Sequence, residues 1–529
     1  MTALTGTRAL TRLALRLDRL RLSIWVVGLS VMPMGTAANY FKLYPTQADL
    51  EAVKGVLTNP SLVALSGPLF GVSIGGLTAW KIGATEFILI GLMNLLTVVR
   101  HTRTEEETGR LELLSATVIG RQAPLTAALV TAGLADAAIA VLSALGLMAT
   151  GLPVAGSIAF GLATGLVGLL FAAIAAAAAQ LTQSARAANG MAAAVLGGAY
   201  LLRAAGDSGP TALSWVSPLG WGLHMRAYAG ERWWVAGLFL GFAVVFAAAG
   251  YALAGRRDVG AGLIAERPGP AQASPSLRSP LALAWRLHRG LLLGWTIALG
   301  LSGAVLGGAA NGLNNLESPN QQLTDILNRM GGNAGLVDAF LGAIFGIVGM
   351  VAAAYTIQAT LRLRQEESSG RVEAILATRV GRLQWAASHL AFAVVGTALL
   401  LAVAGVAGGV VYGAEVHDVG GQVGRIFGAA MVQLPAAWVL AGFGMALIGL
   451  LPRLSTLAWA ALIVSVVLVE LGALFGLNQW VLDVVPFTHV PKLPGAAFTV
   501  TPLLWLTAVA AALGAAGLAG LRRRDMPVG

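Results

Sequence analysis

Long apolar stretches dominate this 529-residue sequence and restrict it to folds that a lipid bilayer can hold. An α-helix needs about 20 mostly apolar residues to cross the hydrocarbon core. Charged residues make up only 11% of the chain, against roughly 25% in soluble domains. The stretches show no strand-like alternation, which argues against a transmembrane barrel. We therefore predict an all-α integral membrane protein with about 12 transmembrane helices. The predicted spans lie near residues 22–41, 82–99, 122–149, 155–182, 190–205, 233–254, 291–312, 340–360, 384–410, 425–452, 456–476 and 501–521.

The distribution of cations predicts the orientation of these spans. If the N-terminus is inside, most of the arginines fall in cytoplasmic segments. The four lysines fall on the other side, namely Lys42, Lys54, Lys81 and Lys492. The positive-inside rule then places both termini of this multi-pass chain in the cytoplasm. The net charge of +10 reflects this orientation. Because the arginines are dispersed and lack an interleaved aromatic platform, no nucleic-acid partner is predicted.

The basic N-terminal region is interpreted as permanent structure, although it resembles a signal peptide. The stretch RLDRLRLSIW at 16–25 recurs as RLHRGLLLGW at 286–295, in the middle of the chain. Leucines recur at helical spacing opposite the arginines. These leucines are Leu10, Leu13, Leu17 and Leu20. We expect a helix lying on the inner membrane surface.

A second repeat sets the domain organisation. The charged phrase RTEEETGRLELLSATVIGR at 103–121 returns as RQEESSGRVEAILATRVGR at 364–382, with ten identities in 19 positions at a shift of 261 residues. A repeat of this length indicates duplication of a structural unit. Because six spans is an even number, both halves cross the membrane in the same sense, as parallel repeats. The predicted parts are a first six-span half (1–255), a Pro-rich cytoplasmic linker (256–280) and a second six-span half (281–529).

The repeated phrase follows the second span of each half, on the cytoplasmic side. Glu106 and Arg110 are four residues apart, as are Glu367 and Arg371, so each pair is predicted to meet on a helix face. A solvated helix at the membrane edge needs charge, but it does not need the same order of charges twice. The phrase is therefore interpreted as a contact for a protein partner that is bound twice.

At these residues the chain resembles the type-2 permeases of ATP-binding-cassette (ABC) exporters. In that family the segment E-x-x-x-G-T-x-E-x-L-L-x-T-P-V-S-R contains the coupling helix that docks on the ATPase subunit. The matching residues here are Glu105, Gly109, Glu112, Leu113, Thr117 and Arg121 in the first half and Glu366, Gly370, Glu373, Leu376, Thr378 and Arg382 in the second. The departures are Arg110 and Arg371 for the threonine, Val118 and Arg379 for the proline, and Gly120 and Gly381 for the serine.

The resemblance implies coupling helices within 105–118 and 366–379. It implies ATPase-coupling roles for Glu105, Glu106, Gly109, Arg110, Glu112, Thr117, Glu366, Glu367, Gly370, Arg371, Glu373 and Thr378. The chain lacks a phosphate-binding G-x-x-x-x-G-K-[ST] loop, since no lysine follows a glycine. Mg-ATP is therefore expected in a separate ATPase, present in two copies, and no cofactor in this chain.

The fused twelve-span form, with its Arg-rich start and Pro-rich linker, resembles exporters of polyketide antibiotics. This likeness implies the permease subunit of an exporter in the plasma membrane of a bacterium. Its cargo would be hydrophobic or amphipathic compounds, such as polyketide antibiotics or drugs, as in multidrug efflux and antibiotic resistance. Membrane lipid is the other expected partner.

The main alternative is an ion-coupled secondary multidrug transporter, which also fits twelve spans in two parallel halves. Asp136, Glu86 and Glu470 lie within predicted spans, where ionisable groups are costly and often functional. The charged phrase, however, differs from the D-R-x-G-R-R/K pattern of that class. A membrane-bound lipid enzyme is a third possibility, but the six histidines are scattered and no acid/base cluster is evident. The chain is predicted not to be an enzyme by itself.

In this permease class, spans 2, 5, 8 and 11 would line the transport route. Polar residues on those spans are the candidate contacts for cargo. They are Glu86, Asn94, Arg203, Tyr355, Gln358 and Glu470.

Overall fold

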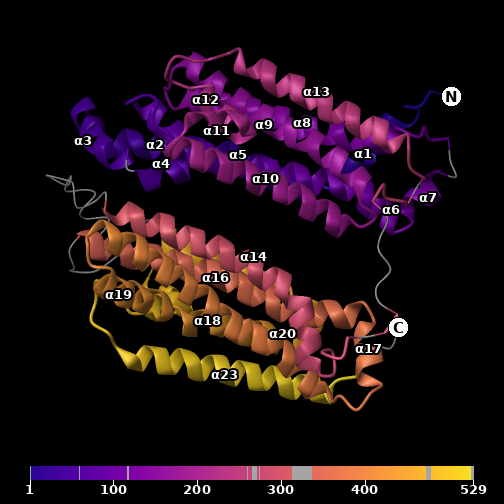
Figure 1. Ribbon diagram of the computed structural model, residues 1–529, viewed down its shortest axis with the longest axis vertical. Helices are drawn as coiled ribbons and strands as arrows, with labels where there is room; N and C mark the ends of the chain where they lie inside the picture. The colour runs from indigo at the N-terminus through magenta and orange to yellow at the C-terminus, as the bar shows by residue number, and fades with distance from the viewer. Residues whose placement is uncertain are drawn as a thin grey trace. The chain divides into compact units, whose positions relative to one another are not determined.

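The computed structural model is helical, with no strand among the residues that it describes. These residues are 2–58, 60–115, 118–258, 260–264, 271–272, 274–311, 336–471 and 478–525. Ten of the described helices are long and apolar enough to cross a membrane. This confirms the predicted all-α integral membrane fold. The chain divides into two compact units, residues 1–269 and 270–529 (Figure 1).

The first unit begins with a short helix and contains five of the long apolar helices. Its elements are α1 (Thr7–Leu17), α2 (Arg19–Leu43), α3 (Gln47–Leu57), α4 (Pro60–Ser66), α5 (Ile74–Val99), the π-helical turn η1 (Arg100–Thr104), α6 (Glu105–Glu107), α7 (Arg110–Ser115), α8 (Ala123–Ala149), α9 (Val154–Leu181), α10 (Ala185–Ser208), α11 (Thr211–Val216), α12 (Pro218–His224) and α13 (Val235–Ala254).

The second unit contains the other five. Its elements are α14 (Pro280–Asn311), α16 (Leu336–Ser368), α17 (Arg371–Leu376), α18 (Arg382–Glu415), α19 (Val419–Met431), α20 (Leu434–Leu450), the 3₁₀ turn η2 (Pro452–Leu454), α21 (Leu457–Leu471), α22 (Gln479–Leu482), the 3₁₀ turn η3 (Pro486–His489) and α23 (Val500–Arg523).

Where the structure describes them, the twelve predicted spans fall on helices, although only ten spans among the described residues meet the length and hydropathy of a membrane span. The other two are α10 and α21. Three charged residues, Arg186, Arg203 and Asp207, lower the hydropathy of α10. The described part of α21 has 15 residues, and the predicted span continued into residues 472–476, outside the described part of the chain.

Helix α9 is the centre of the first unit, where it packs against α5, α8 and α13. The core between α5 and α9 contains Ile90, Met93, Val167 and Phe171, which are all fully buried. Alanine and glycine fill most of the remaining contact surface of α9. Such small residues allow membrane helices to approach closely, which explains the tight central layer.

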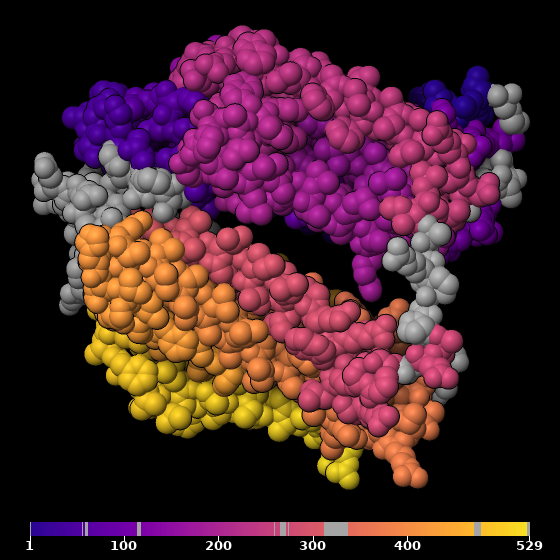
Figure 2. Space-filling model, in the orientation of Figure 1, coloured from indigo at the N-terminus to yellow at the C-terminus, as the bar shows by residue number. Residues whose placement is uncertain are grey.

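In the second unit, α18 packs against α14, α16 and α19. The contact between α14 and α18 depends on glycine, because a Cβ atom at Gly307 would collide with the carbonyl oxygen of Gly408. Helix α23 packs mainly against α20. It runs along the surface of this unit, as the yellow band in Figure 2 shows. Its Leu504 and Trp505 are exposed, as expected for a helix that faces lipid.

A helix, α1, is present at the predicted N-terminal position, and its Leu13 and Leu17 are exposed. Its location on the inner membrane surface stays a prediction. Helix α1 ends beside Asp18, whose carboxylate pairs with Arg100 Nε at 3.0 Å and His101 Nε2 at 2.8 Å. In the repeated stretch of the second unit the corresponding residue is His288. There α14 continues without a break from Pro280 to Asn311. The two halves therefore begin differently despite their related sequences.

Candidate functional site

Both copies of the repeated phrase fold into the same turn, centred on a glycine. In the first unit Gly109 separates α6 from α7, and in the second Gly370 separates α16 from α17. Both glycines have φ of +70°. This left-handed conformation carries no steric cost for glycine but costs other residues roughly 1–2 kcal/mol. Each glycine therefore sets the direction of the short helix that follows it.

The turn places the first glutamate of the phrase beside the arginine that follows the glycine. Arg110 Nη1 lies 3.6 Å from Glu105 Oε1, and Arg371 Nη1 lies 3.5 Å from Glu366 Oε1. The predicted pairing of each arginine with the second glutamate is wrong. That prediction assumed a continuous helix, and the glycine breaks its register. Because both arginines are largely exposed, these pairs contribute little to stability.

The second glutamate of the phrase binds an arginine that follows the last span of its half. In the first unit, Arg257 donates to both carboxylate oxygens of Glu106, at 2.6 and 2.9 Å. Arg103 Nη1 donates to the same carboxylate at 2.6 Å. The Glu106 side chain is only 7% exposed. Its charge is therefore neutralised inside the unit.

The two arginines also fasten the neighbouring backbone. Arg103, which is fully buried, donates to the carbonyl oxygen of Ala179 at 2.9 Å and to that of Ala261 at 3.0 Å. Arg257 Nε donates to Gln180 Oε1 at 2.7 Å. The contacts join the end of α5, the end of α9 and the segment after α13.

The second unit repeats this arrangement with fewer contacts. Arg524 donates to both carboxylate oxygens of Glu367, each at 2.6 Å. Arg364 Nη1 lies 3.2 Å from Glu367 Oε2. The Glu367 side chain is 1% exposed. Two-point arginine–carboxylate pairs are among the strongest charged hydrogen bonds, so α16 and the end of α23 are firmly joined.

The last arginine of the phrase completes the arrangement in both halves. Arg121 Nη2 donates to the carbonyl oxygen of Arg257 at 2.8 Å. Arg382 Nη1 donates to the carbonyl oxygen of Arg524 at 2.7 Å. We call each set an arginine clamp. The first clamp consists of Arg103, Glu106, Arg121 and Arg257, and the second of Arg364, Glu367, Arg382 and Arg524.

The clamp arginines had a sequence signal that the sequence analysis missed. The tripeptide R-R-D follows the sixth span of each half, at 256–258 and at 523–525. It lies about as far from the phrase in both halves, since Arg257 is 151 residues from Glu106 and Arg524 is 157 residues from Glu367. A comparison of the two whole halves would have found it.

Other residues of the two predicted coupling segments, 105–118 and 366–379, face outward. In the first segment Glu112, Leu113 and Val118 are exposed, with Leu113 at 76% and Val118 at 61%. At the matching positions of the second segment Glu373, Ala374 and Arg379 are exposed. Large exposed apolar side chains that lie next to one another are typical of a contact surface for another protein.

The two predicted coupling threonines have different standing. Thr117 lies outside the described residues. Thr378 is exposed, and its hydroxyl donates to the carbonyl oxygen of Ile375 at 2.6 Å. This hydrogen bond stabilises the end of α17. The part of Thr378 in ATPase docking stays a prediction.

Three of the predicted cargo contacts lie in the interior of the first unit. Asn94 of α5 is fully buried and bonds to Asp136 of α8. Glu86 of α5 is also fully buried, and neither carboxylate oxygen has a hydrogen-bond partner among the described residues. Arg203 of α10 donates to Asp207 at 3.2 Å and to the carbonyl oxygens of residues 64 and 65. Arg203 thus anchors α4 to α10.

The remaining three candidates belong to the second unit. Tyr355 is fully buried and its hydroxyl donates to the carbonyl oxygen of Phe392 at 2.9 Å. Gln358 is exposed and accepts a hydrogen bond from Trp295 Nε1 at 3.0 Å. Glu470 lies in α21, and its side chain is outside the described part. The role of all six in transport stays a prediction.

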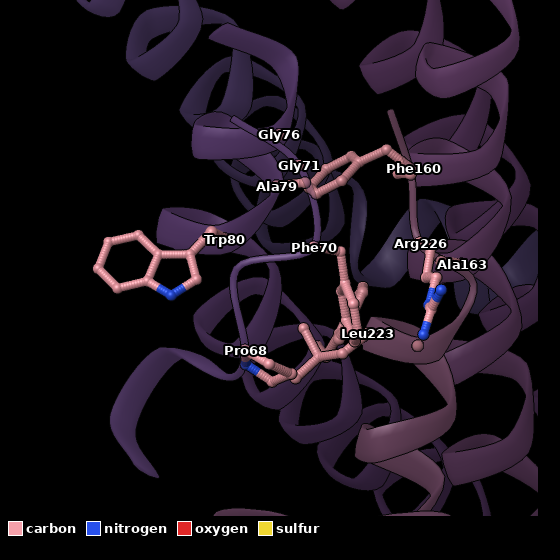
Figure 3. Close-up of a pocket in the computed structure, with 13 residues that line it drawn as sticks. Pro68, Phe70, Gly71, Gly76, Ala79, Trp80, Phe160, Ala163, Leu223 and Arg226 are labelled. Atoms are coloured by element: carbon pink, nitrogen blue, oxygen red, sulfur yellow. The ribbon is translucent and has the colours of Figure 1, made fainter. Parts of the chain in front are cut away.

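A small cavity lies in the first unit, between α5, α9, α12 and the loop that precedes α5 (Figure 3). Phe70, Trp80, Leu223 and Arg226 lie around it, with Phe160 of α9 on one side. Its volume is about 30 Å³, the space of a single water molecule. Drug-sized ligands need about 300–1,000 Å³, so this cavity is not a cargo site.

Beside this cavity, His224 is held as an aromatic packing residue. Its ring stacks on Trp215 at 4.3 Å between ring centres, and neither ring nitrogen has a hydrogen-bond partner among the described residues. Burial, together with the positive charges of Arg232 and Arg226, lowers the pKa of His224 to about 4. The imidazole is therefore neutral near pH 7.

The second unit has a larger, open hollow of about 360 Å³ between α18, α20 and α23. Apolar side chains line it, with Thr507 among the few polar ones. The lining includes Val394, Trp438, Met445 and Leu518. Its size and apolar surface fit a lipid chain or a hydrophobic compound.

Comparison with known proteins agrees with this architecture. Residues 277–522 match the family described as multidrug efflux system permease Rv1217c, C-terminal domain. The chain is also 48% identical, over 525 residues, to the multidrug efflux system permease protein Rv1217c of Mycobacterium tuberculosis, with 99% of this chain and 95% of that protein covered. An identity of this level along nearly the whole length shows common descent and a common fold. The chain is therefore a member of the family of multidrug efflux system permeases.

Proposed function

We propose that this permease is the membrane subunit of a type-2 ABC exporter, driven by two copies of a separate ATPase. Each ATPase would bind Mg-ATP and dock on one coupling segment, residues 105–118 or 366–379. Both segments would face the cytoplasm of a bacterium, with the permease in the plasma membrane and both termini inside. The cargo would be hydrophobic or amphipathic compounds, including polyketide antibiotics.

The observation that carries this proposal is the identical turn at the two coupling segments. Both have a glycine at φ +70° and the same glutamate–arginine pair across it. A partner of one kind could therefore bind both segments in the same way. The exposed Leu113 and Val118 supply an apolar contact in the first segment, whereas exposed Ala374 and Arg379 make the second more polar.

The cargo assignment is supported by the chemistry of the surfaces within each unit. The hollow beside Trp438 is large enough for a small hydrophobic compound and has almost no polar lining. The buried polar candidates Asn94, Arg203 and Tyr355 are occupied in contacts of their own unit. The transported compounds would therefore be selected mainly by apolar contact.

The test is to isolate the tagged permease from its native membrane and identify the proteins that accompany it. The complex is then reconstituted in liposomes, and transport of a fluorescent hydrophobic drug is followed with ATP, with a nonhydrolysable analogue and with an imposed proton gradient. We expect a copurified ATPase and transport that needs hydrolysis. Transport that follows the ion gradient and ignores ATP would overturn the proposal in favour of the ion-coupled alternative.

A further inference from the structure

We propose that Arg257 and Arg524 are positioning residues that make each coupling segment and the end of its sixth span move as one body. The sixth spans are α13 and α23; Arg524 directly follows α23, and Arg257 lies three residues after the end of α13. The inference rests on the proposed function, because the movement would come from ATPase subunits on the coupling segments. It adds a direct mechanical path from those segments to the last span of each half.

The inference rests on one observation: in each unit, two residues of the repeated phrase contact the same arginine. Two positions of the phrase that are 15 residues apart contact the same arginine outside the phrase. In the second unit they are Glu367, through both oxygens, and Arg382, through the arginine's own carbonyl oxygen. In the first unit Glu106 and Arg121 make the matching contacts with Arg257. Recurrence in both halves shows that the contact belongs to the repeated design.

The clamp adds a connection that the helix packing does not supply. Helix α23 packs mainly against α20, and α13 mainly against α9. The second clamp ties the end of α23 to the end of α16, and the first ties the segment after α13 to the end of α5. A push on either coupling segment therefore reaches the sixth span without passing through spans three to five.

Burial argues that the clamps stay closed while the segments move. The Glu367 and Glu106 side chains are 1% and 7% exposed. Separating Glu106 from Arg257, or Glu367 from Arg524, would break a two-point charged hydrogen bond at a carboxylate that water hardly reaches, which is strongly unfavourable. Movement of the segment with its clamp intact avoids that state.

The two clamps are unequal. If Arg257 is removed, Arg103 still binds both Glu106 and the carbonyl oxygen of Ala261, at 2.6 and 3.0 Å. If Arg524 is removed, only Arg364 remains on Glu367, and it reaches no residue of the sixth span among the contacts described. The sixth span of the second half therefore depends more completely on Arg524 than the sixth span of the first half depends on Arg257.

The first experiment compares Arg524→Ala and Arg257→Ala with matched controls from the same R-R-D tripeptides. Arg523→Ala and Arg256→Ala remove the neighbouring arginines, which are exposed. In reconstituted complexes we expect Arg524→Ala to keep its ATPase but to transport about tenfold less drug per ATP hydrolysed, the size of a typical coupling free energy. Arg257→Ala should reduce the drug transported per ATP by less than Arg524→Ala does. Both controls should behave as the wild type. Normal transport per ATP in Arg524→Ala would overturn the proposal.

A second experiment leaves every residue of both clamps in place. The chain has no cysteine, so spin labels can be placed through Ala374→Cys and Arg523→Cys, both at exposed positions. The distance between the labels is measured by pulsed electron resonance without nucleotide and with ATP and vanadate. We expect the same narrow distance in both states. A distance that changes with nucleotide would show that the second clamp opens, which contradicts the inference. Absence of a copurified ATPase would instead remove the proposed function, so the two failures are distinguishable.

Discussion

Asn94 Nδ2 donates a hydrogen bond of 2.7 Å to Asp136 Oδ1 and thereby joins α5 to α8 inside the first unit. The same nitrogen also donates to the carbonyl oxygen of Ile90 at 3.0 Å. Gly168 of α9 lies directly against this pair, because a Cβ atom there would collide with Asp136 Oδ1. Three membrane helices thus meet at a polar contact that only a glycine accommodates. The intramembrane acid that could suggest ion coupling is held in this contact between helices.

Gly168→Ala should therefore destabilise the permease. The added methyl group has to displace the Asp136 carboxylate or separate α9 from α8, and overpacking of this kind costs about 1–3 kcal/mol. The measurement is the melting temperature of the purified protein in detergent.

Gly133→Ala in α8 is the matched control, since nothing lies within 4 Å of its Cβ position. Replacing a glycine inside a helix by alanine stabilises the folded protein by about 0.5–1 kcal/mol. This variant should therefore melt at the same temperature as the wild type or at a higher one. Equal melting temperatures for the two variants would mean that the polar contact has room to spare.

Charge reversal at the exposed acids should separate docking from folding. Glu112→Lys and Glu373→Lys change residues on the outward face of the coupling segments. Like charges brought together at a protein interface cost several kcal/mol. We therefore expect less copurified ATPase, with normal membrane insertion and an unchanged melting temperature.

Charge reversal at the acids of the clamps should instead destabilise the folded protein. Glu106→Lys and Glu367→Lys each place a cation against two arginines, so the folded protein itself should be lost or melt early. If the exposed reversals leave ATPase binding and transport intact, the docking role of the segments is refuted. The outward charges would then only mark the membrane edge.

Protonation of His224 gives a stability change with a defined sign. The unfolded chain binds a proton at this residue near pH 6.5, whereas the folded protein binds it only at about 4. As the pH falls from about 6.5 to about 4, the unfolded state gains the proton first and the folded state is progressively destabilised, by at most roughly 3 kcal/mol.

His224→Phe should flatten this dependence. Phenylalanine keeps the stacking on Trp215 but binds no proton. Melting temperatures of the wild type and the variant are compared between pH 7 and pH 4.5. Parallel curves would show that other groups cause the acid sensitivity.

Sequence reasoning identified the membrane fold because each predicted span needs only a local property, a long apolar stretch. In the described part of the chain, all twelve predicted spans fall on helices. It also located the repeated phrase, but it gave Glu106 and Glu367 the wrong partners. A helix of ordinary period places each opposite the arginine four residues on, whereas the glycine at φ +70° turns the chain at that point.

The true partners, Arg257 and Arg524, lie more than 150 residues away in the sequence. No periodic pattern connects residues at that separation. Burial of Asn94 and Tyr355 was unpredictable for a similar reason, because a span of about 20 apolar residues indicates that it crosses the membrane but not which face packs against a neighbour.

The position of a break in the chain should decide whether a split permease works. The boundary between the two compact units falls between residues 269 and 270 of the sequence, and both residues of each glutamate–arginine pair belong to the same unit. Coexpressed fragments 1–268 and 269–529 keep Arg257 attached to α13, so they should assemble and transport. Fragments 1–255 and 256–529 differ only in the place of the cut. They leave α13 intact but separate Arg257 from it. The first clamp is then no longer covalently connected to α13, the sixth span of its half.

We expect the second pair of fragments to insert and to bind the ATPase, yet to transport less drug per ATP than the first pair. Arg103 still holds Glu106 in the first unit, but its other contact, the carbonyl oxygen of Ala261, is cut from α13 together with Arg257. The measurement is ATP-driven transport in liposomes for both pairs, beside the uncut permease. Inactivity of both pairs despite stable insertion would show that residues 256–280 have a mechanical role as a continuous linker. Equal activity of both pairs would show that the first clamp needs no covalent connection to α13.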